Sequence, residues 1–245
     1  TVFVGDHIQS MTGEEAFNWL GGEYTSNASV EGLENIPKDG KFLIVSNHPM
    51  GAADAIALYY KIYPVRNDLF FFANELFVYL LGAFHELLAP VVWNKEKETH
   101  SASKVTLERL SVFFGDDRPG IIFPSGRLSK LTFLGLWDRP WEKTPIALAK
   151  KYNFPLIPVY VEGRNSWFFY FASYVNKQLR DISQLNELFN KREKEMSIKI
   201  GKPVNVYTLN DNTDIAIGQM RYKSESLRKK SVLKLNRFLY LRNFK

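Results

Sequence analysis

A histidine and an aspartate with five residues between them stand in residues 46–54 (SNHPMGAAD). The hydrophobic run 42–45 (FLIV) before them predicts a buried strand, and the run 52–60 (AADAIALYY) after the turn residues predicts a helix. His48 would then follow the carboxyl end of a strand, where layered α/β proteins keep their chemistry. Asp54 would lie in the first helical turn. A carboxylate there can orient the imidazole and make its other nitrogen a general base that takes a proton from an alcohol.

The same pair has a structural interpretation. His48 can be a turn residue, and Asp54 can be a capping carboxylate that suits the helix dipole. The segment alone leaves both interpretations open, so the residues further along the chain decide between them.

Two later segments repeat the pattern of a buried strand followed by a turn. Residues 121–129 (IIFPSGRLS) end in a Pro/Gly turn with a cation and two hydroxyls, and residues 155–163 (PLIPVYVEG) supply a third strand. Together with residues 46–54, and in this order, they resemble the glycerolipid acyltransferase family typified by 1-acylglycerol-3-phosphate acyltransferases. The resemblance runs from residues 30–37 (VEGLENIP) to 200–204 (IGKPV), roughly two thirds of the chain.

The resemblance implies catalytic roles for the first pair. His48 corresponds to the catalytic histidine that deprotonates the acceptor hydroxyl, and Asp54 corresponds to its aspartate partner. The family usually has four residues between the two. The five found here, with Pro and Gly in the turn, resemble the haemolysin-like and ornithine-lipid branch of the family.

The second segment departs from the family's usual Phe-Pro-Glu-Gly-Thr-Arg-Ser. Ser125 replaces the glutamate, and Arg127 stands one place earlier than the usual arginine. We expect Arg127 to bind the acidic group of the acceptor through a charge-assisted pair. Ser125, Gly126 and Ser129 are expected to line the same substrate site.

The mechanism implied by the resemblance is direct acyl transfer, without a covalent enzyme intermediate and with no cofactor beyond the co-substrate. The acceptor oxygen attacks the thioester of an acyl carrier protein (acyl-ACP) or coenzyme A (acyl-CoA) donor. Backbone N–H groups near Gly51 or in the turn 125–126 are expected to stabilise the oxyanion. Residues 90–95 (PVVWNK) resemble the phosphate-binding segment but lack its arginine. A lyso-aminolipid acceptor is thereby slightly favoured over a lysophosphatidic acid, and both stay open.

Composition excludes several other classes of protein. The chain has no cysteine, which rules out disulfides, a thiol nucleophile and thiolate metal sites. Its four histidines are scattered, so no metal centre is expected. Because G-x-S-x-G is absent, Ser125 is not a hydrolase nucleophile in the usual setting, and the G-x-G-x-x-G and phosphate-loop motifs are absent too.

Predicted strands and helices alternate along the chain. This order favours one α/β domain over residues 1–245, a layered fold with a largely parallel or mixed sheet flanked by helices. The predicted strands cover residues 42–45, 69–72, 90–93, 121–123, 156–161 and 197–206. The predicted helices cover residues 52–60, 75–84, 103–114 with Ser103 as cap, 144–151, and 177–195, the last charged and exposed.

Two features point to a membrane surface, although no segment is long and apolar enough to span one and no signal-peptide pattern is present. Residues 165–174 (NSWFFYFASY), expected to form a loop, favour either membrane or acyl-chain contact or buried packing. Residues 221–245 carry nine Lys or Arg and one acid, a local balance of +8, with apolar residues near helical spacing. They read as a basic amphipathic helix on anionic lipid or as a docked terminal helix.

These observations predict a peripheral protein at the cytoplasmic face of a membrane that acylates a lyso-lipid. Its expected partners are the lyso-lipid acceptor, the acyl carrier protein or coenzyme A thioester, and the membrane surface. Nucleic acid is not expected, because the basic tail comes with no recognisable reader fold. The alternative is a catalytically silent lipid-binding protein of the same fold.

Overall fold

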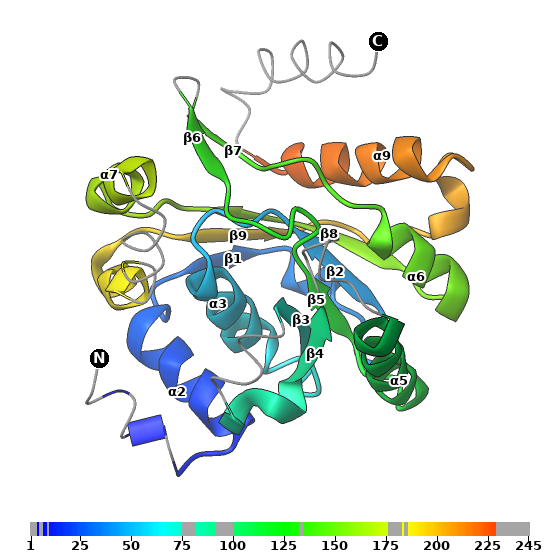
Figure 1. The fold of residues 1–245 in the computed structure, drawn as a ribbon, viewed down its shortest axis with the longest axis horizontal. Helices are drawn as coiled ribbons and strands as arrows, with labels where there is room; N and C mark the ends of the chain where they lie inside the picture. Colours follow the sequence, from blue (N-terminus) through cyan, green and yellow to red (C-terminus); the bar gives the residue numbers. More distant parts are fainter. Residues whose placement is uncertain are drawn as a thin grey trace.

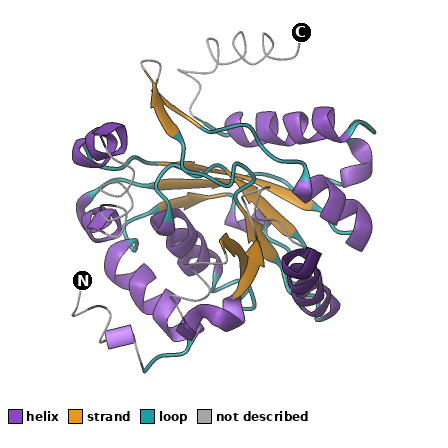
Figure 2. Cartoon of the chain, viewed as in Figure 1, coloured by secondary structure: helices purple, strands orange, loops and turns teal. Residues whose placement is uncertain are grey.

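A seven-stranded mixed sheet forms the centre of the molecule (Figures 1 and 2). The computed structural model describes residues 4, 7–8, 10–74, 82–91, 100–132, 135–175, 183 and 186–228. In sheet order the strands are β1 (Ser29–Glu31), β9 (Ser197–Ile200), β8 (Leu156–Glu162), β2 (Leu43–Ser46), β5 (Gly120–Ile122), β3 (Phe70–Asn74) and β4 (Leu88–Val91). The strands from β8 to β4 are parallel to one another, whereas β9 is antiparallel to β8 and β1 is parallel to β9.

The central strand β2 is buried along its whole length, as the unbroken hydrophobic run predicts. Leu43 stands in register with Gly120 of β5 and with Leu156 of β8. Because β5, β2 and β8 are parallel neighbours, their carboxyl ends meet at one edge of the sheet. The segments that follow these three strands are therefore brought together.

Helices cover both faces of the sheet (Figure 1). Ile44 of β2 packs in a core shared with α2 and α3, whereas Leu43 and Val45 pack in a second core shared with α5, α6 and α9. Each large apolar side chain that is fully buried contributes roughly 1.5–3 kcal/mol, so both layers hold the central strands firmly. The helices are α2 (Gly13–Tyr24), α3 (Ala52–Ile62), α5 (His100–Gly115), α6 (Thr144–Tyr152), α7 (Trp167–Val175) and α9 (Thr213–Glu225).

Short elements complete the described part of the chain. A hairpin of β6 (Lys130–Thr132) and β7 (Gly135–Trp137) stands apart from the large sheet. The 3-10 turns are η1 (Leu33–Asn35), η2 (Gly82–Leu87), η3 (Asn190–Glu193) and η4 (Val206–Thr208). The sequence did not predict β1, α2 or the hairpin.

Most predicted elements near the sheet are confirmed, with shifts at their ends. One cap is wrong: α5 begins at His100, so Ser103 lies inside the helix, since no Gly or Pro separates it from the residues before it. Strand β4 begins at Leu88, two residues before the expected start. At the last strand, β9 ends at Ile200, and only an isolated bridge from Leu156 to Val204 continues the pairing.

The loop expected over residues 165–174 is also wrong, because α7 occupies most of it. The Ser166 hydroxyl accepts the N–H of Phe169 at 3.1 Å and so caps this helix. Within the helix expected over residues 177–195, residues 183 and 186–189 are helical, and the 3-10 turn η3 follows them. The expected exposure is wrong at Glu187 and Lys191, which are both buried. These two side chains form an ion pair, which makes their burial possible.

Some predictions concern residues outside the described ranges. They include residues 75–81 of one expected helix, residues 92–95 of the expected phosphate-binding segment, residues 176–182, and residues 229–245 of the basic tail. Residues 221–225 belong to α9. None of the helices in the described part combines the length and the hydropathy that a membrane crossing requires.

Candidate active site

The turn between β2 and α3 brings the predicted histidine and aspartate together. Nδ1 of His48 lies 3.0 Å from Oδ2 of Asp54. The same Oδ2 accepts the N–H groups of Met50 at 2.9 Å and Gly51 at 3.1 Å. Gly51 has φ 81° and ψ −132°, a backbone conformation that glycine adopts more readily than other residues. This conformation lets the chain enter α3 with the Asp54 carboxylate directed back toward the turn. Asp54 thus caps the helix and contacts the imidazole at once.

The side chains of His48 and Asp54 differ in their burial. Asp54 is 0% exposed, whereas the His48 side chain is 19% exposed. A carboxylate beside Nδ1 favours the tautomer with its proton on that nitrogen, which leaves Nε2 as the nitrogen able to accept a proton. The His48 ring is also stacked on Phe123, with centroids 4.0 Å apart and planes at 22°. The ring is therefore fixed in orientation and reachable from solvent, as a general base requires.

The turn that holds His48 is bonded to the neighbouring strand β8. Asn47 donates to the Val161 carbonyl at 2.8 Å and accepts the Val161 N–H at 2.7 Å through its side-chain amide. Beyond β8, a Cβ added at Gly163 would stand 2.5 Å from Sδ of Met50, so glycine lets the Met50 side chain pack closely here. These contacts fix the turn that holds His48 to the end of β8.

The segment after β5 lies on the other side of His48. The N–H of Ser129 donates to the His48 carbonyl at 2.8 Å. Within the turn, the Ser125 hydroxyl donates to the Arg127 carbonyl at 2.8 Å, and Gly126 donates its N–H to Phe123 at 2.9 Å with φ 58°. The structure therefore brings Ser129 to His48, while Ser125 and Gly126 use their donors to shape the turn.

Arg127 is exposed at this same edge. Its side chain makes no ion pair or hydrogen bond with any residue in the described ranges. The guanidinium is therefore available to an anion from solution, and its binding of the acceptor stays a prediction.

Asp138 is a site residue that the sequence did not indicate. Its Oδ1 accepts the Ser129 hydroxyl at 2.9 Å and the His48 N–H at 3.4 Å, and its Oδ2 accepts the Trp141 indole N–H at 2.6 Å. Burial raises the pKa of Asp138, and the hydrogen bonds from Trp141 and Ser129 oppose this rise. The His48 peptide is thus held on both sides, at its N–H by Asp138 and at its carbonyl by Ser129.

No metal centre accompanies these groups in the part of the chain that the structure describes, where no cluster of three or more His, Asp or Glu side chains could hold an ion. The polar groups at hand are one imidazole, two carboxylates and backbone N–H groups. This set fits proton transfer between an imidazole and a bound hydroxyl.

A family model described as "Acyltransferase" matches residues 15–239. The chain belongs to this acyltransferase family. The match covers His48, Asp54, the turn 123–129 and Asp138, so the geometry above lies within the family's own region.

Two relatives named lyso-glycine lipid O-acyltransferase are similar to this chain. The proteins of Phocaeicola vulgatus and Bacteroides thetaiotaomicron are each 32% identical to it over 186 residues, which is 73% of this chain. The matched region is 64% and 66% of their lengths, so the chain spans just under two thirds of these relatives.

A solved structure shares the fold. The 1-acyl-sn-glycerophosphate (LPA) acyltransferase PlsC from Thermotoga maritima superposes with a TM-score of 0.53 over 94% of this chain and 79% of its own, at 22% identity. The layered α/β fold expected from the sequence is therefore confirmed.

Proposed function

We propose that this protein transfers a fatty acyl group from acyl-ACP or acyl-CoA to the hydroxyl of a lyso-lipid. The observation that carries the proposal is the 3.0 Å contact between His48 and the buried Asp54, at the edge where three parallel strands end. The membership of the chain in the acyltransferase family supports acyl transfer as the reaction of this pair.

The acyl group moves in a direct displacement. His48 takes the proton of the acceptor hydroxyl on Nε2 while Asp54 holds Nδ1. The acceptor oxygen forms a bond to the thioester carbonyl carbon, and the tetrahedral intermediate collapses by breaking the carbon–sulfur bond. The thiolate that leaves takes the proton back from His48, so the enzyme ends as it began.

The oxyanion of the intermediate needs N–H donors that are not already bonded. The N–H groups of Met50 and Gly51 bond to Asp54, and the N–H of Gly126 bonds to Phe123, so these expected donors are occupied. Ala52 opens α3 and is exposed. Since the first N–H groups of a helix lack partners within it, we assign the oxyanion to the N–H of Ala52.

The acceptor site is assigned to Arg127, whose exposed guanidinium can pair with a carboxylate or a phosphate. The hydroxyls of Ser125 and Ser129 both donate to protein oxygens, so they would meet the acceptor only as hydrogen-bond acceptors. The names of the two relatives favour a lyso-glycine lipid, an acceptor with a carboxylate. A peripheral position at the membrane, supported by the charge of residues 221–245, would bring the enzyme to this acceptor.

A transfer assay on the purified chain tests the proposal. The four pairings of acyl-ACP or acyl-CoA with lyso-glycine lipid or lysophosphatidic acid are followed by release of thiol and by formation of the diacylated product. We expect transfer in at least one pairing, with lyso-glycine lipid the better acceptor. Binding of both acceptors without transfer from either donor would contradict the proposal and would favour the silent lipid-binding protein.

A further inference from the structure

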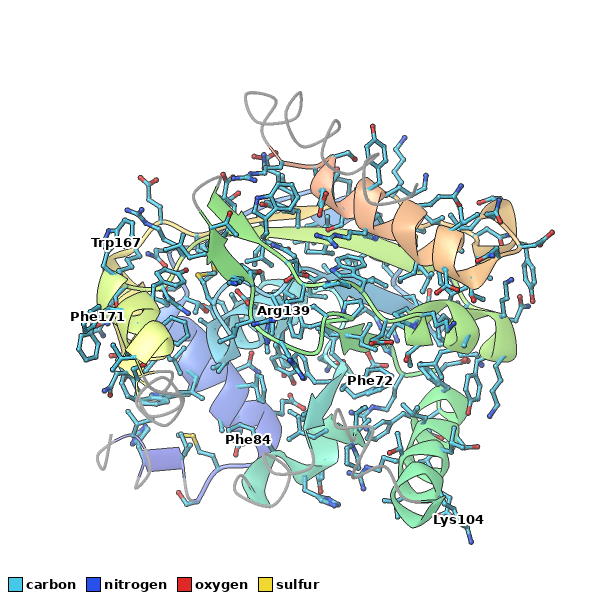
Figure 3. All side chains as sticks on the ribbon, turned by 45° about the horizontal axis from the view of Figure 1, so that its top comes forward. Phe72, Phe84, Lys104, Arg139, Trp167 and Phe171 are labelled. Carbon is cyan, nitrogen blue, oxygen red and sulfur yellow. The ribbon has the colours of Figure 1, made fainter. Side chains whose placement is uncertain are left out.

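Helix α7 exposes most of its large apolar side chains. Trp167 is 70% exposed, Phe168 and Phe171 are 67% exposed, and Val175 is 58% exposed. Their spacing places them along one side of the helix, which we call the α7 face. Figure 3 shows Trp167 and Phe171 at the outer boundary of the molecule. Such a continuous apolar patch marks a surface of interaction.

Polar groups hold the connection that leads into α7. Glu187 accepts both the N–H and the hydroxyl of Ser166. Lys191 donates to Glu187 at 3.3 Å, to the Asn165 side chain at 2.7 Å and to the Arg164 carbonyl at 3.0 Å. Glu187 and Lys191 are almost completely buried. A buried, fully hydrogen-bonded pair has little freedom to move, so it presents the helix in one orientation.

Few apolar side chains of α7 pack against the rest of the protein. Phe169 and Ala172 are the buried apolar residues of α7 among those whose side chains are described. The exposed aromatic side chains are therefore not needed to attach the helix. Packing in the hydrophobic core therefore does not explain where these side chains lie.

The α7 face starts beside the candidate active site. Helix α7 follows β8 after only four residues, and the Asn47 side chain bonds to Val161 at the end of that strand. Gly163, the first residue of the connection, packs on Met50 in the turn after His48. Because β8 and β2 are parallel neighbours, α7 begins at the edge of the sheet where His48 lies.

The charges around the face fit an anionic lipid surface. The α7 segment contains no charged residue, and the exposed Arg164 before it lies 5.8 Å from the centre of the Trp167 ring. Tryptophan beside a cation is typical of the bilayer interface. Elsewhere in the sequence, residues 229–245, which lie outside the described ranges, carry positive charges and no acid: Lys229, Lys230, Lys234, Arg237, Arg242 and Lys245.

We propose that the α7 face docks on a bilayer containing anionic lipid and holds the edge with His48 against the surface where the lyso-lipid acceptor resides. The docking itself rests on the exposure of the α7 face and on the charge of Arg164 beside it. Its benefit for catalysis rests on the proposed function. Insertion of the aromatic side chains supplies a binding contribution that salt does not screen, whereas Arg164 and the basic tail supply one that salt does screen.

Co-sedimentation with vesicles tests the docking. The vesicles hold equal parts of phosphatidylcholine and phosphatidylglycerol, and binding is measured at low and at high salt. The test variant replaces Trp167, Phe168 and Phe171 with Ser. The control variant replaces Val105, Leu107 and Val112 of α5 with Ser, because these apolar side chains are also exposed but on another helix. Thermal unfolding of both variants confirms that the fold is kept.

We expect the α7 variant to lose the salt-resistant binding, with the partition coefficient falling roughly tenfold or more, while the α5 variant binds like the wild type. Equal binding of the wild type and the α7 variant at high salt would overturn the proposal. So would a self-association of the wild type that the α7 variant abolishes while vesicle binding persists, since the face would then join two copies of the chain.

Activity separates the docking from the proposed reaction. With the acceptor embedded in vesicles, transfer by the α7 variant should fall in step with its binding, whereas transfer to acceptor dispersed in detergent should be retained. A wild type that binds vesicles through α7 and transfers no acyl group would contradict the proposed function and support the docking alone.

Discussion

At the scale of single residues, two aspartates hold His48 in different ways. Asp54 contacts the ring at Nδ1, whereas Asp138 accepts the backbone N–H and bonds to Ser129, which in turn binds the His48 carbonyl. The sequence indicated His48 and Asp54 because one short strand, turn and helix contains both. Asp138 stands 90 positions from His48, and nothing in the local pattern around it predicts this contact.

Replacing Asp138 tests its role as a positioning residue. Asp138→Ala removes the acceptor of the His48 N–H, so we expect kcat to fall roughly 10- to 100-fold because of misplacement of the base, with little change in KM for the acyl donor. Asp138→Asn keeps an oxygen for Ser129 and should restore part of the rate. The measurement is steady-state transfer with both variants. Equal kcat values for wild type and Asp138→Ala would remove Asp138 from the site.

Replacing Arg127 tests acceptor binding. Arg127→Ala removes an exposed cation that has no partner in the described ranges, so stability should not change, and KM for an anionic acceptor should rise far more than KM for the donor. Lys130→Ala, which removes an exposed cation close in the sequence, is the control and should change neither value. A rise of the same size for donor and acceptor would show that Arg127 supports the turn instead.

At the scale of elements, α7 shows where local pattern fails. Its composition is apolar throughout, so periodicity could not show which side is buried, and the loop that its position suggested was wrong. The orientation of α7 depends instead on contacts between the residues at its start and residues about twenty positions further along the chain. Glu187 and Lys191, expected on an exposed charged helix, are buried and anchor the residues that lead into α7.

This anchor predicts a pH-dependent contribution to stability. Burial alone would raise the pKa of Glu187, but hydrogen bonds from Ser166 and the charge of Lys191 outweigh burial, so the pKa is lowered from its ordinary 4.5. A carboxyl group with a lowered folded-state pKa stabilises the fold above its unfolded value, and this contribution is lost as the pH falls through the folded value. Below pH 4.5 the anchor should therefore weaken.

Glu187→Gln is expected to cost about 3 kcal/mol at pH 7, since Lys191 is left buried without its counter-charge. For a chain of this size the loss lowers Tm by roughly 6–12 °C. The difference in Tm between wild type and variant should shrink as the pH falls below 4.5, and Glu195→Gln, at an exposed site, should show no difference. Thermal unfolding from pH 7 to pH 3 measures this. A constant difference over that range would contradict the anchor.

At the scale of the whole molecule, hydrophobic runs located most strands of the large sheet but could not order them. The parallel strands from β8 to β4 follow from alternation of strands and helices. In contrast, β9 returns antiparallel to β8 and β1 joins beyond it, and each pairing depends on contacts between distant parts of the chain. The contact between His48 and Asp54 could be predicted better than the sheet because both residues lie in one continuous segment.

Transfer by His48→Ala tests the general base most directly. The purified variant is compared with wild type and with His85→Ala, which alters an exposed histidine of η2. Loss of the base should lower kcat by roughly 10²- to 10⁴-fold or more, with Tm close to that of the wild type, while His85→Ala keeps full activity. Near-normal acyl transfer to a lyso-lipid by folded His48→Ala would contradict the central role given to His48.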